Sequence, residues 1–168
     1  MDTEYDRFYI GDKTFSAHAG KQEFQDNLLR QFPREGAAIK AYMGLLNQVS
    51  KAMPVFAMSR LLKPWQRTVM GPYLRAKIPE LLFRPTYDVL SEITDDQDLI
   101  AVLAGQWGDL GLPPRKSSFV VHALIARHYL YGGFYPIGGS WKIAESIIPR
   151  IKRAGGEVFT YALVKKIL

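Results

Sequence analysis

Residues 117–140, SSFVVHALIARHYLYGGFYPIGGS, carry the pattern that decides the fold. A serine pair precedes apolar residues at helical spacing, among them Val121 and Leu124, which is typical of a capped helix with one buried face. Two glycines then end that helix and a short extended piece follows. A second glycine pair leads to Ser140, a good cap for another helix over residues 141–154. The stretch therefore predicts two helices joined by a glycine-rich connection.

The N-terminal half reads as a hairpin followed by helices. Residues 6–17 place apolar residues on either side of a Gly11-Asp12 turn, which predicts two antiparallel strands. Residues 21–32 put phenylalanine and leucine on one helical face, and Pro33 suits the first turn of a second helix. Beyond that helix the chain is expected to break into short helical pieces at five prolines, which stand at positions 54, 64, 72, 79 and 85.

The C-terminal half adds a helix and ends in extended chain. The segment TDDQ, which starts at Thr94, is a capping box, and it predicts a helix that runs to Gln106. A Gly155-Gly156 stop follows the helix expected over residues 141–154. Residues 157–160 and 163–168 then read as strands. An apolar strand with no partner after it indicates a sheet that other sequence completes.

Composition and charge exclude several classes of protein. The 168 residues include no cysteine, which excludes a disulfide framework, a thiolate zinc site and a cysteine nucleophile. The acidic first residues predict no secretory signal peptide, and no apolar run is long enough to predict a transmembrane helix. Hydrophobic residues make up 48% and charged residues 23%, as in folded globular proteins. We therefore expect a protein that is neither secreted nor membrane-spanning.

The formal charge of +6 is unevenly distributed. No acid occurs between Glu35 and Glu80, whereas seven basic residues alternate there with aliphatic and aromatic ones. Such a mixture fits an anionic lipid surface, a nucleic acid, or a solvated basic face over an ordinary core. We predict peripheral membrane docking through residues 51–84, on the cytoplasmic face, and no nucleic-acid partner.

The histidines do not indicate a metal centre. His122 and His128 lie six residues apart on one predicted helix, about 240° around it, so they do not share a face. His18 lies in the hairpin, and no nucleophile–base pair is visible. The acids at 95, 96 and 98 match a helix first turn, because no glycine and closing glutamate follow at calcium-loop spacing. The sequence predicts no metal site.

Three motifs carry a resemblance to a known family. They are AGQWGDLGLPP at residues 104–114, SSFVVHALIARHYLY at 117–131 and GGFYPIGGS at 132–140. In order and spacing they resemble the FAD-dependent oxidoreductases of the retinol saturase, carotenoid isomerase and phytoene desaturase family. The resemblance is dense from residue 99 to 168 and continues, more weakly, back to the hairpin. The chain looks like an internal piece of such an enzyme.

The resemblance implies a fold and cofactor contacts. The fold class is α+β: a mostly helical, substrate-side domain with a hairpin over residues 1–131, and a turn–helix–strand segment over 132–168 that belongs to an incomplete FAD-binding α/β domain. The loop of Gly138, Gly139 and Ser140 is expected near the flavin ring, and Val164 near the adenine end. Taken alone, glycines before a capped helix fit either an anion-facing backbone or plain turn chemistry.

The resemblance also implies a substrate and a reaction. Helices at 94–106 and 118–130 would enclose a channel for a long apolar polyene, with Trp107, Tyr131 and Tyr135 as lining residues; core packing explains such aromatics equally well. The flavin would transfer a hydride at a carbon–carbon double bond of a retinoid- or carotenoid-like substrate, with NAD(P)H as a candidate electron source. The resemblance identifies no catalytic acid, base or nucleophile.

One expected motif is missing. Enzymes of this family begin with G-x-G-x-x-G, which holds the FAD pyrophosphate, and this sequence has no such pattern. We therefore expect the chain alone to be incomplete and inactive, and to need the absent FAD-domain segments as partners. The alternative function is a non-catalytic membrane-surface or lipid-binding module.

Overall fold

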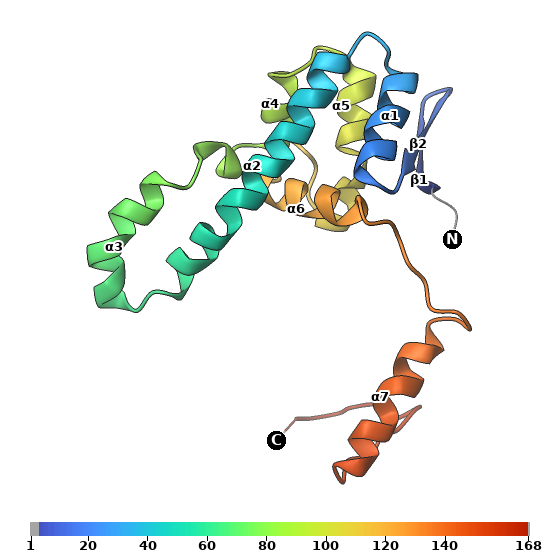
Figure 1. Ribbon diagram of the computed structural model, residues 1–168. Coiled ribbons are helices and arrows are strands. Elements are labelled where there is room, and N and C mark those ends of the chain that lie inside the picture. Colours follow the sequence, from blue (N-terminus) through green and yellow to red (C-terminus); the bar gives the residue numbers. More distant parts are fainter. Residues whose placement is uncertain (1–3, 168) are drawn as a thin grey trace. The chain divides into compact units, whose positions relative to one another are not determined.

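The chain divides into two compact units. The computed structural model describes residues 4–167, and the first unit ends at Gly133 while the second begins at Phe134. A hairpin and helices make up the first unit, and one helix with irregular chain makes up the second (Figure 1). The α+β class with an N-terminal antiparallel hairpin is confirmed. The assignment of a substrate role to residues 1–131 and of a cofactor role to 132–168 stays a prediction.

The hairpin joins β1 (Glu4–Ile10) to β2 (Lys13–His18). The two strands pair antiparallel, and Gly11 takes the left-handed conformation that the tight turn needs, with φ 57°. On one face of β2, Phe15 and Ala17 are buried. Phe15 stacks on Phe32, at 5.2 Å between ring centroids, so the hairpin is fixed to the end of the helix that follows.

Helices of the first unit enclose one core. Their bounds are α1 Lys21–Gln31, α2 Gly36–Leu61, α3 Pro64–Ala76, α4 Thr86–Ser91, α5 Gln97–Leu103 and α6 Phe119–Tyr129, with short 3-10 turns η1 Glu80–Phe83 and η2 Gly105–Leu110. The N-terminal part of α2 is the central element and packs against α1 and α6. Its side chains Ile39 and Leu46 are buried, together with Phe119 of α6. This core fixes α6, and with it the chain that leads to Gly133.

The prolines interrupt the helices less than the sequence predicted. Helix α2 runs through Pro54 and α3 runs through Pro72, so the expected breaks at these two positions are wrong. A proline removes one backbone hydrogen bond, and both helices continue across that loss. Pro64 does begin α3. The second helix starts at Gly36, not in the turn of Pro33.

The predicted capping box at Thr94 is also wrong in detail. The N-cap of α5 is Asp96, whose carboxylate accepts the backbone N–H groups of Asp98 and Leu99 at 2.9 and 3.0 Å. The hydroxyl of Thr94 instead donates to a carboxylate oxygen of Glu35 at 2.7 Å, which joins the start of α5 to the start of α2.

The second unit contains α7 (Trp141–Arg153) and no strand among its described residues. The helix confirms the prediction for residues 141–154 apart from its end, but the strands predicted at 157–160 and 163–167 are absent. Those residues have no neighbouring strand with which to pair, and an isolated extended segment does not form a ladder. Residue 168 lies outside the described residues. Ser140 precedes α7 without a side-chain capping bond, so that predicted cap is wrong.

Candidate functional site

The glycine turn predicted to face a flavin has a backbone conformation that favours glycine. Gly138 and Gly139 both have φ 92°, which L side chains rarely adopt. A Cβ on Gly139 would meet nothing within 4 Å. The Ser140 N–H donates to the hydroxyl of Tyr135 at 3.1 Å, so the structure brings these two predicted site residues together. The turn leaves room at Gly139 for a flat ligand to approach the backbone.

The other predicted site residues are exposed. Trp107 lies in η2 and Tyr131 follows α6, both in the first unit, whereas Tyr135 and Val164 belong to the second. All four side chains are open to solvent. None of them lines the hollow described next. Their assignment to a substrate channel or to FAD stays a prediction.

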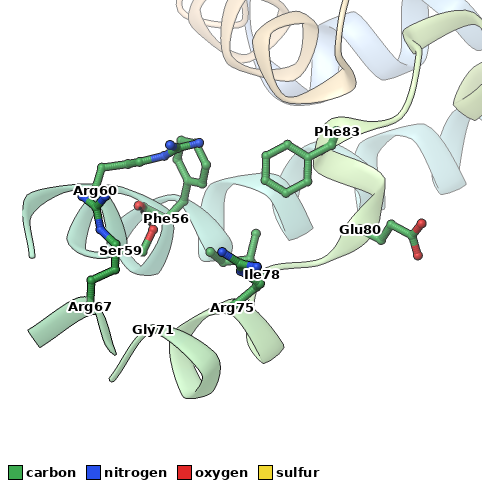
Figure 2. A pocket seen from close by; sticks show the side chains of 9 residues that line it. All are labelled: Phe56, Ser59, Arg60, Arg67, Gly71, Arg75, Ile78, Glu80 and Phe83. Carbon is green, nitrogen blue, oxygen red and sulfur yellow. Dashed lines mark hydrogen bonds between the residues drawn. The ribbon is translucent and has the colours of Figure 1, made fainter. Parts of the chain in front are cut away.

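A hollow that the sequence did not predict lies between α2 and α3, and we call it the arginine groove. Its volume is about 530 Å³, and it opens between the C-terminal half of α2, the facing side of α3 and the chain leading to η1 (Figure 2). The lining residues are Phe56, Ser59, Arg60, Arg67, Gly71, Arg75, Ile78, Glu80 and Phe83. All of them fall within the acid-poor stretch for which membrane docking is predicted.

A tight reversal between the two helices creates this groove. Helix α2 ends at Leu61, and α3 begins at once with Pro64 in its first turn, where a missing N–H costs nothing. The backbone N–H of Lys63 donates to the side chain of Gln66 at 3.0 Å and holds the turn. The reversal lays α3 alongside α2 (Figure 1), and Leu74 is the buried residue of α3.

Aromatic rings form the apolar wall of the groove. The rings of Phe56 and Phe83 meet at 5.9 Å between centroids, which links α2 to η1. The Arg60 guanidinium lies over the Phe56 ring, at 5.3 Å from its centroid. Gly71 lies on the α3 side, where the absence of a side chain keeps the hollow open. The wall is thus apolar, and its rim is cationic.

The charges of the groove are not balanced by the protein. Arg60, Arg67 and Arg75 line it, and Glu80 is the single acid among its lining residues. Within residues 4–167, none of these three arginines forms a salt bridge to a carboxylate. Unpaired guanidinium groups beside an apolar wall favour an anion that carries an apolar part.

Exposed apolar side chains also lie on the same two helices, and those at Trp65, Val69 and Tyr73 occupy the face of α3 opposite the groove. Exposed fractions reach 85% for Leu61, 74% for Val69 and 67% for Trp65. The exposed hydrophobic side chains of this helix pair are Met58, Leu61, Trp65, Val69, Met70 and Tyr73, which we call the apolar ridge. Large exposed apolar groups that lie together indicate an interaction site. In the part of the chain that the structure describes, no helix is both long and apolar enough to cross a bilayer.

A buried polar pair lies in the core of the first unit. The hydroxyl of Tyr42 and Nε2 of His122 form a hydrogen bond at 3.1 Å, between α2 and α6. Burial lowers the pKa of His122 from 6.5 to about 4 and raises the pKa of Tyr42 above its ordinary value. His122 is therefore neutral at pH 7 and serves packing. No cluster of three or more potential metal ligands occurs among the described residues.

Comparison with known proteins places these features in a family. No family model and no solved structure matches the chain. The all-trans-retinol 13,14-reductase of Danio rerio is 32% identical over 176 residues, which cover 100% of this chain and 29% of that protein. The protein of the same name from Homo sapiens is 35% identical over 167 residues, covering 94% of this chain and 27% of its own length. A Danio rerio protein named inactive all-trans-retinol 13,14-reductase is 27% identical over 161 residues, covering 93% and 26%.

The names of these relatives indicate the class of protein. Two of the three are named reductases, so the chain is homologous to part of an oxidoreductase. The resemblance found in the sequence is confirmed: over its length the chain is homologous to part of the all-trans-retinol 13,14-reductases, the retinol saturases. It spans less than a third of the length of these relatives. Because one relative is named inactive, membership alone does not decide whether a protein is catalytic.

Proposed function

We propose that this chain forms part of a flavin-dependent oxidoreductase that acts on a carbon–carbon double bond of a retinoid-like polyene. The observation that carries the proposal is the similarity to two all-trans-retinol 13,14-reductases over 94% to 100% of the chain. The similarity includes both units, so it covers the glycine turn as well as the helical core.

The turn at residues 138–140 fits a flavin contact. Open space at Gly139 and a backbone that only glycine adopts easily would let a flat ring approach closely. The flavin, when bound, would supply hydride transfer, and this chain would orient the polyene and exclude water. Because the sequence has no G-x-G-x-x-G, most of the FAD contacts would come from segments outside this chain.

A matched pair of glycine variants tests the flavin contact. Gly139 and Gly155 both have positive φ, and a Cβ on either would meet nothing within 4 Å, so an alanine strains both turns alike. The 168-residue chain is co-expressed with the flanking segments of a retinol 13,14-reductase, and flavin absorbance per folded complex is measured. We expect flavin with the unchanged chain and with Gly155→Ala, and a loss with Gly139→Ala. Equal flavin occupancy in both variants would show that the turn at residues 138–140 does not contact the flavin.

The chain alone supplies the second arm of this test. Without the flanking segments we expect no stoichiometric flavin absorbance after purification, because the pyrophosphate-binding motif is absent. A yellow, flavin-loaded chain purified without partners would contradict the division of cofactor contacts proposed here.

We further propose that the apolar ridge docks the protein on an anionic membrane surface. The support is the combination of exposed Leu61, Trp65 and Val69 with the basic residues of the same helices. Apolar side chains would enter the interface while lysine and arginine reach the headgroups. A protein that acts on apolar polyenes would gain access to its substrate in this way.

Liposome sedimentation tests the docking. Trp65, Val69 and Tyr73 changed together to Ser should release the full chain from anionic vesicles. The control changes three other exposed hydrophobic residues of the first unit, Tyr9, Leu112 and Val121, to Ser. It should leave sedimentation unchanged. If both triple variants bind like the unchanged chain, the ridge is not a membrane contact.

A further inference from the structure

The arginine groove contains positive charge that the rest of the protein leaves uncompensated. Elsewhere in the described residues, five basic side chains have carboxylate partners within 4.0 Å, namely Arg7, Lys13, Arg30, Arg84 and Lys142. Arg60, Arg67 and Arg75 have none, like the other lysines and arginines of the described residues, but these three line one hollow (Figure 2). Three guanidinium groups that line one hollow make it positive, so a bound anion would be attracted there.

The charge of the lining indicates which anion fits. Three arginines against Glu80 leave a net charge of +2, from three positive groups less one negative. A phosphate monoester carries about −1.5 to −2 at pH 7, whereas a phosphodiester carries about −1. Guanidinium groups also bind phosphate oxygens through paired N–H donors. The lining therefore matches a phosphomonoester better than a singly charged headgroup.

The walls of the groove indicate that this phosphate is attached to an apolar group. Phe56, Ile78 and Phe83 line the same hollow as the arginines. The Ser59 hydroxyl donates to the backbone carbonyl of Phe56 at 2.6 Å, so its proton is already used and it can only accept from a ligand. An apolar wall offers nothing to a free phosphate ion, but it suits the glycerol and first acyl carbons of a lipid.

We propose that the arginine groove is a binding site for the headgroup of a phosphomonoester lipid, of the phosphatidic acid class, in the membrane on which the protein docks. The inference rests on the docking proposed above, which would hold this helix pair at the bilayer. Leu61 and Trp65 are exposed at the turn between α2 and α3, so contact of this turn with the bilayer would bring Arg60 and Arg67, one and two residues away, to headgroup level. The groove would give selectivity, and the ridge would give attachment.

Two vesicle compositions separate the groove from general electrostatic attraction. One contains neutral phosphatidylcholine with a minor fraction of phosphatidic acid, and the other contains twice that fraction of phosphatidylserine, so their surface charges match. We expect the full chain to bind the phosphatidic acid vesicles more tightly. Arg67→Gln with Arg75→Gln should weaken that binding by about tenfold or more and remove the preference.

A matched control removes equal charge outside the groove. Lys51 and Lys63 are exposed residues of the same basic segment and do not line the hollow. Lys51→Gln with Lys63→Gln should lower binding to both vesicles alike and leave the preference intact. Arg67→Lys with Arg75→Lys keeps the charge but removes the paired donors, and should reduce the preference without abolishing attachment.

The outcomes distinguish the two proposals. Failure of the full chain to bind either vesicle would refute membrane docking and the groove assignment with it. Equal binding to both vesicles, or equal loss from the arginine and lysine pairs, would leave docking standing and overturn the headgroup site. Release by inorganic phosphate at matched ionic strength would show that the groove binds a soluble phosphate compound, which would also overturn the lipid assignment.

Discussion

Acid should destabilise the first unit through His122. This side chain is buried between α2 and α6, and burial lowers its pKa from 6.5 in the unfolded chain to about 4 in the folded one. The unfolded state therefore takes up a proton first as the pH falls, and the stabilising contribution present above pH 6.5 is lost on the way to pH 4. The full shift corresponds to about 3 kcal/mol, of which about 2 kcal/mol is lost by pH 5.

Urea unfolding of the full chain at pH 7 and pH 5 measures this loss. His122→Gln keeps a polar side chain beside Tyr42 but does not titrate. Between pH 7 and pH 5 its unfolding free energy should therefore fall by about 2 kcal/mol less than that of the unchanged chain. His128→Gln, an exposed position on the same helix, should behave like the unchanged chain. Comparing variants cancels the titration of the carboxylates. An identical pH dependence for His122→Gln and the unchanged chain would refute the assignment.

Smaller changes test the local corrections to the fold by urea unfolding at pH 7. Asp96→Ala should cost about 1 kcal/mol because it removes a cap, whereas Ser140→Ala, which removes no capping bond, should leave the unfolding free energy within a few tenths of a kcal/mol. Gly105→Ala would place a Cβ 2.5 Å from the Phe8 ring and should cost about 1–3 kcal/mol. Gly44→Ala, inside α2 with nothing within 4 Å, should stabilise by about 0.5–1 kcal/mol. A neutral Asp96→Ala, or a Gly105→Ala as stable as Gly44→Ala, would contradict these assignments.

Sequence patterns predicted the elements that depend on residues close together in the chain. The hairpin and the helix at 21–31 follow from alternation, a glycine turn and helical periodicity, and both are confirmed. The cap of α5 was misplaced because Thr94 and Asp96 are both capping residues. The Thr94 hydroxyl accepts from the Asp96 N–H and donates to Glu35, which is far away in sequence, while Asp96 caps the helix. Such a contact is invisible to a pattern that spans four residues.

The sequence could identify the segment that contains the arginine groove, but not the groove itself. Missing acids and interleaved aromatics identified the segment, but the convergence of Arg60 with Arg67 and Arg75 requires the reversal between α2 and α3. The sequence predicted a break at Pro72, between Arg67 and Arg75, which would place these two residues on independent pieces, whereas α3 runs through it. Whether a proline breaks a helix depends on how well the rest of that helix packs, and packing is set by the whole fold.

The second unit has no buried core of its own, although the similarity to relatives extends over it. None of its described residues is buried, yet α7 carries Ala144, Ile147 and Ile151 at helical spacing on one face. A helix of 13 residues with an uncovered apolar face is marginal in water by itself. The match to the Danio rerio reductase nevertheless covers 100% of this chain, including α7, and only 29% of the longer protein. Within the second unit, no other helix or strand of the described residues is available to cover this face.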